Sequence, residues 1–310
     1  MYKGLKISVV VPAFNEERLV AETIRSMPEL VDHVFVIDDC SADGTSEAAK
    51  SVDDPRVEVI RHEVNTGVGG AIITGHRRAM EVGGDIDVVM AGDAQMDPRY
   101  LPALLDPIAD EGYGFTKANR FFGFESFHGM PLHRVFGNVI LSFLTKVASG
   151  YWNLFDPQNG YTAIRQDVLA RLPLDKIAKR YQFENDLLVH LAILSVRAKD
   201  VPIPAKYGAE ISTMRLSRVA REISTLLFRR FWQRIWWKYV LWSFSPIALL
   251  LFSGLGLMLF GLGWGIFATV SALNANSPTA GTVLLAVTPM MTGVYMLIQA
   301  LILDIQATPS

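Results

Sequence analysis

The feature that most restricts the fold is a long stretch without charge, because residues 239–303 contain no Asp, Glu, Lys, Arg or His. An ordinary soluble domain, in which about a quarter of the residues are charged, does not leave so long a segment uncharged. Residues 241–270 and 281–303 each exceed the roughly 20 apolar residues that cross about 30 Å of hydrocarbon. Asn and Pro in residues 271–279 predict a short turn between them. The sequence therefore predicts two membrane-spanning helices joined as a hairpin.

The segment before this hairpin, residues 214–238, is basic and rich in aromatic residues. It holds seven cations against the single carboxylate of Glu222, whereas residues 1–214 carry a net charge of −7. Arginines interleaved with Phe and Trp are typical of a helix that lies among lipid headgroups. A solvated linker helix packed on its own domain is the alternative. Because the cations precede an apolar tail, they indicate an anionic membrane surface as partner and no nucleic acid.

The distribution of cations also predicts an orientation. Cations precede the first span and none lies in the turn, which places both ends of the hairpin, residues 239–304, and the short tail 305–310 in the cytosol. The chain starts with a strand-length apolar run and no secretory signal, so we expect the catalytic domain to be cytosolic. Cys40 is the only cysteine, which excludes a disulfide framework. We predict an integral membrane protein, in the plasma membrane if the source is bacterial.

Within a predicted domain of residues 1–213, the sequence alternates between strand and helix patterns up to about residue 118. Short β-branched runs without polar alternation are typical of buried parallel strands. The predicted strands are 7–11, 34–37, 57–60 and 88–90, and the predicted helices are 18–27, 46–51, 71–81 and 100–110. Repeated strand–helix–strand units predict a doubly wound sheet whose site lies at the carboxyl ends of its strands.

Polar side chains follow the first two strands. Pro12 is predicted to end the first strand, which leaves Asn15 and Glu16 at the mouth of the sheet, where a base or ribose can be held. Alone, this segment is also a common helix start. Asp38 and Asp39 close the second strand, and a carboxylate there accepts hydrogen bonds from a ribose.

The turns after the third and fourth strands suit a diphosphate. Asn65 and Gly67 lie in a glycine-rich turn, whose backbone can approach a phosphate at a helix N-terminus. After the fourth strand, Asp93, Gln95 and Asp97 place oxygen ligands on alternate residues. Such ligands suit one hard divalent cation, Mg²⁺ or Mn²⁺, bridging a diphosphate.

Taken in order, these segments resemble the family 2 glycosyltransferases of the GT-A fold. More narrowly, they are similar to the polyprenyl-phosphate glycosyltransferases, the group of dolichol-phosphate mannosyltransferase and its bacterial undecaprenyl-phosphate relatives. Residues 12–16 correspond to Pro-x-Tyr-Asn-Glu, with Phe14 for Tyr, and residues 38–41 correspond to Asp-Asp-Gly-Ser. In the Asp-x-Asp-x-Gln metal motif, Asp93 and Gln95 align, but Ala91 replaces the first Asp. This departure implies a weaker cation site, or one completed by Asp97, water and the diphosphate.

The resemblance covers about residues 6–215 and implies a Rossmann-like, mostly parallel sheet. It assigns the acceptor phosphate to Arg120, Arg134 and Asn138, and it makes Asp93 and Asp156 the catalytic carboxylates, Asp156 as base or acceptor-orienting group. It implies that Glu184 and Asp186 contact the sugar or only cap a helix. The residues it implies for nucleotide-sugar binding are Pro12, Ala13, Phe14, Asn15, Glu16, Asp38, Asp39, Asn65, Gly67, Gly92, Asp93 and Lys206.

The activity that the resemblance implies is inverting transfer of one sugar from a UDP- or GDP-linked donor to a membrane polyprenyl phosphate, with Mg²⁺ or Mn²⁺. A different lipid acceptor, or a catalytically impaired nucleotide-sugar-binding scaffold suggested by Ala91, is the alternative. A polymerising synthase would carry Gln-x-x-Arg-Trp, which residues 233–236 do not match, and a nucleotidyltransferase would not explain residues 156–161. Oligomerisation through the spans stays open, since Gly261 and Gly265 form a single small-residue pair.

Overall fold

The computed structural model describes residues 1–121, 132–204, 216–273 and 278–309. The chain forms two compact units, one of Met1–Phe231 with Pro309–Ser310 and one of Trp232–Thr308. The boundary between the units thus falls inside the basic segment and not at its start.

The first unit is built on a mixed sheet that the described residues form with seven strands in the order β3-β2-β1-β4-β6-β5-β7. The strands are β1 (Ile7–Ala13), β2 (His33–Asp38), β3 (Val57–Arg61), β4 (Ile86–Val89), β5 (Phe115–Asn119), β6 (Thr162–Arg165) and β7 (Ala198–Pro202). Strand β6 runs antiparallel to β4 and β5, and the other pairs are parallel. The four predicted strands and the mostly parallel sheet are confirmed.

The prediction that Pro12 ends the first strand is wrong, because β1 continues to Ala13. Proline cannot donate to a ladder, but its carbonyl accepts from Gly92 N at 3.1 Å, and the Ala13 carbonyl accepts from Asp39 N at 2.9 Å. These two bonds hold the loops after β2 and β4 beside the end of β1.

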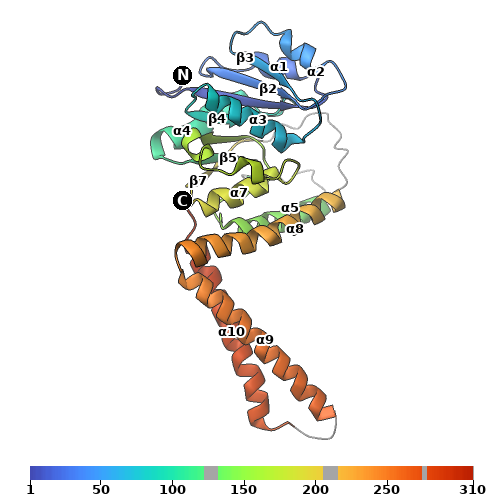
Figure 1. Ribbon diagram of the computed structural model, residues 1–310, viewed down its shortest axis with the longest axis vertical. Coiled ribbons are helices and arrows are strands. Elements are labelled where there is room, and N and C mark those ends of the chain that lie inside the picture. The colour runs from blue at the N-terminus through green and yellow to red at the C-terminus, as the bar shows by residue number, and fades with distance from the viewer. Residues whose placement is uncertain (122–131, 205–215, 274–277, 310) are drawn as a thin grey trace. The chain divides into compact units, whose positions relative to one another are not determined.

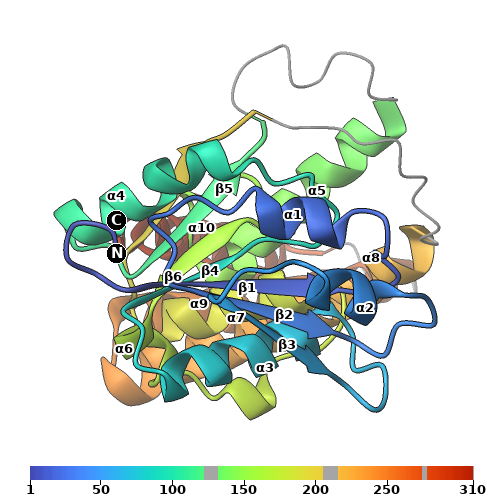
Figure 2. The ribbon, with the colours of Figure 1, turned by 90° about the horizontal axis from the view of Figure 1, so that it is seen from above.

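Helices cover both faces of this sheet (Figures 1 and 2). The helices of the first face are α1 (Val20–Arg25), α2 (Thr45–Lys50) and α4 (Leu101–Glu111), and those of the second are α3 (Val68–Glu81), α6 (Gln166–Leu169) and α7 (Phe183–Ile193). Alternate residues of the buried strands feed the two cores, because successive strand side chains point to opposite faces. The four predicted helices are present, with ends that differ by a few residues.

Two longer helices, α5 (Leu132–Ser149) and α8 (Leu216–Arg234), pack near α7 on the second face. Ile223 and Leu227 of α8 are buried in a cluster with residues of α5 and α7. Arg230 reaches the buried carboxylate of Asp186, with Nε 2.6 Å from Oδ1. The first part of the basic segment is therefore bound to the first unit, as in the alternative to the interfacial prediction, while Arg221, Phe228 and Arg229 stay exposed.

The second unit contains α9 (Pro246–Leu273) and α10 (Ala280–Gln306), both long and apolar enough to cross a membrane. The predicted start of the first span at residue 241 is wrong, because an eight-residue π-helix (η4, Ile235–Trp242) precedes a break at which Phe244 has φ 42°. The new helix begins with Pro246, at a position where a missing N–H costs nothing.

Glycines bring α9 and α10 into backbone contact. A Cβ at Gly254 would lie 2.9 Å from the Gly293 carbonyl oxygen, and one at Gly261 would lie 2.6 Å from the Ala286 carbonyl oxygen. A Cβ at Gly265 would meet only the Ala286 side chain, at 3.7 Å. The glycines therefore pack the hairpin itself, and of the predicted pair only Gly261 requires glycine.

A buried ion pair joins the start of the second unit to its end. Arg234, 1% exposed, donates to Asp304 over 2.6 Å, and the Tyr239 hydroxyl donates to the same carboxylate over 2.5 Å. Together with the Arg230–Asp186 pair, this contact occupies two of the cations that precede the spans. Fewer arginines than the sequence suggests are thus left to attract anionic lipid.

Candidate functional site

The polar residues predicted after β4 and β5 line one pocket of about 220 Å³, whereas those predicted after β1, β2 and β3 are not among its lining residues. Its lining combines the loop after β4, the end of β5 and the segment before β6. The lining residues are Asp93, Gln95, Met96, Asp97, Ala118, Arg120, Asn159, Gly160, Tyr161, Ile203 and Pro204. The predicted cation ligands and one predicted acceptor residue therefore share one cavity.

Of the two carboxylates that line this pocket, Asp93 has fewer hydrogen bonds and no ion pair with the described residues to stabilise its charge. Its Oδ1 accepts from Gln95 N at 3.1 Å, and no Lys, Arg or His in the described part of the chain forms an ion pair with it. Burial raises the pKa of Asp93, and the backbone hydrogen bonds only partly oppose that. A desolvated carboxylate beside the Gln95 amide fits a divalent cation, which would restore the missing positive charge.

The other possible ligand in this loop, Asp97, is already engaged. Its carboxylate accepts from Arg99 N at 2.9 Å and from the Arg99 guanidinium at 2.6 Å, which caps a short 3₁₀ turn. A role for Asp97 in completing the cation site would require this ion pair with exposed Arg99 to open, and it stays a prediction. Within the described ranges no cluster of three His, Cys, Asp or Glu residues could hold a metal alone. Asp93 and Gln95 stay the predicted cation ligands of this chain, and the prediction leaves the other ligands to water and the donor diphosphate.

Asp38 and Asp39 are buried rather than presented to a ligand. Asp38 is fully buried and accepts from Ser41 N at 2.8 Å, from the Ser46 hydroxyl, and from Arg61 at 3.2 Å. Burial opposes ionisation, but these partners outweigh it and lower the pKa of Asp38. The side chain thus fixes the loop after β2.

Asp39 holds the glycine-rich turn in the same way. Its carboxylate accepts from Thr66 N at 2.8 Å, Gly67 N at 2.7 Å and His62 Nδ1 at 2.8 Å, while Asn65 Nδ2 donates to its carbonyl at 3.1 Å. Burial again opposes ionisation and the hydrogen bonds lower the pKa of Asp39.

Gly67, which was predicted to lie against a phosphate, packs against another segment of the protein. It has φ 91°, and a Cβ there would lie 2.6 Å from the Lys179 carbonyl oxygen. Its glycine is therefore required by close packing and by a left-handed backbone.

Hydrogen bonds connect the turn after β1 to the turn after β2. Asn15, with φ 59°, donates its N–H to the Ser41 hydroxyl at 3.0 Å, and its Oδ1 accepts from Ala42 N at 2.9 Å. Phe14 is 48% exposed, and Gly92 packs against Ala13. An exposed ring beside two ordered turns is free to stack on a nucleoside base.

Arg120 and Asp156 form one unit. Asp156 is 1% exposed and accepts from Arg120 Nε at 2.8 Å and from a terminal guanidinium nitrogen at 3.1 Å. This bidentate pair fixes the guanidinium at the edge of the pocket. Asp156 is therefore placed to orient Arg120. Arg134 and Asn138 lie in α5 with side chains outside the described residues, and Lys206 is also outside them.

Sequence reasoning missed Asp200 on β7 and Lys117 on β5. Asp200 accepts from Asn119 Nδ2 at 3.0 Å and from Phe155 N at 2.6 Å, and its second oxygen is buried without a hydrogen bond. Burial raises the pKa of Asp200 to about 6. The sequence assigns no role to either residue, although Lys117 opens the segment 117–120 that resembles a family motif, and the pairing of β5 with β7 brings the two together.

Asp200 predicts a pH dependence of stability. Because the folded pKa of about 6 exceeds the ordinary 3.8, the folded state binds the proton more tightly, and stability falls as pH rises from about 4 to 6. Asp200→Asn removes this titration, so from pH 4 to pH 7 the variant should gain about 2 kcal/mol of unfolding free energy relative to the parent chain. Unfolding in detergent micelles across this range measures the difference. Parallel curves for the two proteins would contradict the assignment.

Comparison with known proteins agrees with this arrangement. Residues 8–172 match the sequence profile described as Glycosyl transferase family 2. The chain is 30% identical over 216 residues to a UDP-N-acetylglucosamine–dolichyl-phosphate N-acetylglucosaminyltransferase of Methanococcus voltae, covering 65% of this chain and 86% of that protein. It is 32% identical over 206 residues to an undecaprenyl-phosphate mannosyltransferase of Micrococcus luteus, covering 64% and 83%.

Among solved structures, the chain is similar to glucosyl-3-phosphoglycerate synthase from Mycobacterium tuberculosis in complex with Mn²⁺, UDP and glucosyl-3-phosphoglycerate. The TM-score is 0.55 at 24% identity, over 73% of this chain and 80% of that one. At this identity the likeness shows the fold, and the predicted GT-A-like architecture is confirmed.

Proposed function

This chain belongs to glycosyl transferase family 2, and from that premise we propose that it transfers one sugar, with inversion, from a UDP- or GDP-linked donor to a membrane polyprenyl phosphate. The observation that carries the proposal is the shared pocket that joins Asp93 and Gln95 to Arg120, in a chain with two membrane-length apolar helices. The activities for which the two polyprenyl-phosphate relatives are named support the acceptor class.

The donor lies at the first two turns and at the loop after β4. Phe14, Asn15 and Glu16 face the nucleoside, while Asp38 and Asp39 hold the neighbouring turns in place. Pro12, Ala13, Asn65, Gly67 and Gly92 shape the same edge of the sheet, and Lys206 supplies a cation for the diphosphate.

Asp93 and Gln95 would hold the divalent cation, and the Mn²⁺ complex of the structural relative supports that cofactor class. When bound, such a cation neutralises charge on the leaving diphosphate. The carboxylate of Asp93 and the amide of Gln95 orient the donor beside it.

The acceptor end of the pocket is built on Arg120. A guanidinium fixed by a buried carboxylate binds phosphate with defined geometry, and Arg134 and Asn138 complete the acceptor site. Because a phosphate acceptor is already an anion at neutral pH, no base is needed to deprotonate it. Asp156 therefore acts by positioning Arg120, and catalysis rests on alignment and charge neutralisation.

The tail brings the catalytic domain to its lipid substrate. Trp236, Trp237 and Trp242, just before α9, are 43–56% exposed, which is typical of a belt at the membrane–water interface. Arg221 and Arg229 are exposed cations of the preceding helix. We place this end of the hairpin, both termini and the catalytic domain on the cytosolic side.

The test uses membranes that contain the full chain. They are incubated with radiolabelled UDP-glucose, UDP-N-acetylglucosamine or GDP-mannose and with Mg²⁺ or Mn²⁺, and the organic phase is counted after extraction. Counts in a lipid that releases free sugar in mild acid, and that exceed those from membranes without the chain, support the proposal. Counts in another lipid would indicate a different acceptor, and donor binding without transfer would indicate the scaffold alternative.

A further inference from the structure

Asp200 is a carboxylate on β7 to which the proposed reaction assigns no role. It forms no ion pair with the described residues, and one of its oxygens accepts two hydrogen bonds, from Asn119 Nδ2 at 3.0 Å and from Phe155 N at 2.6 Å. Asn119 directly precedes Arg120 in the chain, and Phe155 directly precedes Asp156. A single acceptor atom thus joins the two segments that carry the Arg120–Asp156 pair.

The Asn119 side chain extends this contact to the backbone around Arg120. Its Oδ1 accepts from Phe121 N at 2.9 Å. Because a backbone N–H can only donate, the amide oxygen must face Phe121 and the amide nitrogen must face Asp200. The Asn119 carbonyl accepts from Ile203 N at 3.1 Å. The residues on both sides of Arg120 are therefore held in place, and Asp200 is the acceptor that fixes the amide between them.

Phe155 holds the second segment, which carries Asp156. Its N–H donates to Asp200, and its ring meets the Phe121 ring edge-on, with 6.4 Å between the centroids. The Asp156 carboxylate in turn accepts from Arg120 N at 3.2 Å and from Arg120 Nε at 2.8 Å. Loss of the acceptor at Asp200 would let this segment shift against the end of β5.

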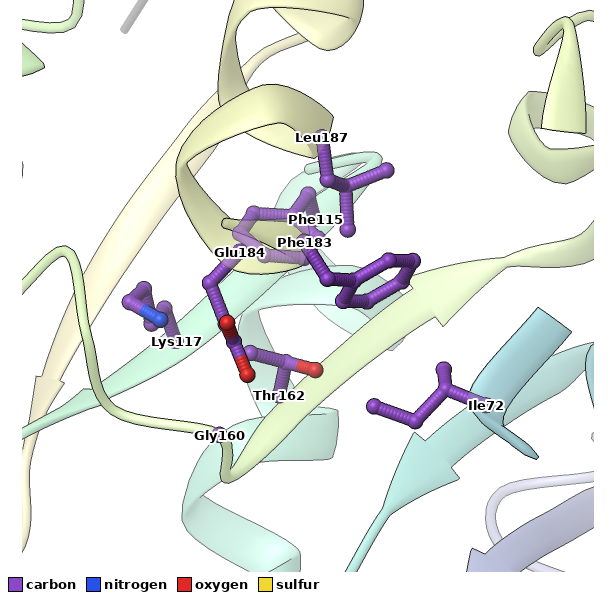
Figure 3. Close-up of a pocket in the computed structure, with 8 residues that line it drawn as sticks. All are labelled: Ile72, Phe115, Lys117, Gly160, Thr162, Phe183, Glu184 and Leu187. Carbon is purple, nitrogen blue, oxygen red and sulfur yellow. The ribbon is translucent and has the colours of Figure 1, made fainter. Parts of the chain in front are cut away.

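Asp200 contributes hydrogen bonds here and not an ion pair. Lys117, which lies opposite it in the β5–β7 register, donates to the Asn159 carbonyl. Figure 3 shows Lys117 to one side of the Glu184 carboxylate, in the wall of a small pocket with room for about one water molecule. The positive charge of Lys117 favours the ionised form of Asp200 without contact. The two hydrogen bonds are therefore the direct link from Asp200 to the pair.

We propose that Asp200 is a positioning residue for the acceptor phosphate, because its two hydrogen bonds fix the segments that carry Arg120 and Asp156. This inference rests on the proposed function, which places the acceptor phosphate at Arg120. A guanidinium whose chain neighbours are held meets the phosphate in one geometry. Without the acceptor at Asp200 it samples more orientations, so phosphate affinity falls. The end of the main pocket that Asp93 lines is unaffected.

The test measures acceptor binding without donor, so that it is independent of transfer. For the full chain in detergent micelles, Kd is measured for farnesyl phosphate, a short isoprenyl phosphate, and separately for UDP and GDP with Mn²⁺. Asp200→Ala should raise the Kd of farnesyl phosphate about tenfold and leave that of the tighter nucleotide within about twofold. Asp200→Asn keeps an oxygen that accepts both hydrogen bonds and removes the charge, so the Kd of farnesyl phosphate should stay within about threefold of the parent value.

A second background separates positioning from folding. In Arg120→Met/Asp156→Asn the pair is already absent, so adding Asp200→Ala should change the Kd of farnesyl phosphate by less than about twofold. Asp32→Ala is the matched control. Its carboxylate also accepts from a backbone N–H, that of Ile7 at 2.8 Å, but at the start of β1, and its loss should change neither Kd.

Three results would overturn the inference. Equal losses in Asp200→Ala and Asp200→Asn would assign the effect to charge, and equal losses in the parent and in Arg120→Met/Asp156→Asn would show that Asp200 does not act through the pair. A parent chain that binds farnesyl phosphate no more tightly than farnesol would leave no phosphate recognition to position. The expected differences in binding, without transfer by the parent chain, would support the inference and count against the proposed function.

Discussion

Asp93→Asn is expected to lower turnover by at least about 10³-fold and to remove the dependence of donor binding on Mg²⁺ or Mn²⁺. Asp93 is the carboxylate of the main pocket that lacks a cationic partner among the described residues, and burial raises its pKa, so a divalent cation is the partner that its surroundings favour. Asparagine keeps the size of the side chain and removes the charge. Steady-state transfer and calorimetric titration of the donor, each with and without cation, measure the two effects.

Two further variants of the same loop sharpen this prediction. Asp97→Asn should change turnover by less than about threefold, since that carboxylate is engaged by Arg99. Ala91→Asp restores the residue missing from the metal motif and should tighten cation binding. If Asp97→Asn were as damaging as Asp93→Asn, the cation would be held by Asp97 and the loop would have to rearrange around Arg99.

Local patterns predicted the first half of the sheet, because short β-branched runs and helix-start residues act over a few positions. They could not predict β6, which inserts between β4 and β5 with reversed direction. Its short sequence carries no sign of orientation, which depends on partners far away in the chain. The start of α9 was misplaced for a similar reason, since residues 241–245 are apolar but the backbone breaks before Pro246.

In the candidate site, motifs predicted where residues lie along the chain but not which way their side chains point. Matching Asp38 and Asp39 to a motif locates them at a strand end, but the direction of each side chain depends on the following turn, in which Cys40 has φ 63°. Both carboxylates turn inward to backbone N–H groups, which places them in support of the site. Lys117 lies on β5 and Glu184 on α7. A single sequence does not show that these distant segments pack around one pocket.

Arg120→Met is expected to lower kcat/KM for the polyprenyl-phosphate acceptor by about 10²–10³-fold, while the Kd of the donor changes by less than about threefold. The guanidinium is fixed by two hydrogen bonds to a buried carboxylate, so it meets an incoming phosphate without losing further conformational freedom. Asp156→Asn keeps the arginine but weakens its fixation, and a smaller loss of about 10–100-fold should follow. Acceptor titrations at saturating donor, with separate donor-binding measurements, resolve the two.

Stability must be separated from this acceptor effect, since Arg120→Met leaves Asp156 buried without its cation, at a cost of about 3–5 kcal/mol. The double variant Arg120→Met/Asp156→Asn should recover most of that stability and none of the acceptor activity. Arg165→Met removes a comparable arginine, which pairs with exposed Asp167 at the opposite end of the sheet, and should leave kcat/KM unchanged. An equal loss of donor affinity in Arg120→Met would assign the guanidinium to the diphosphate, and the acceptor phosphate would then depend on Arg134 and Asn138.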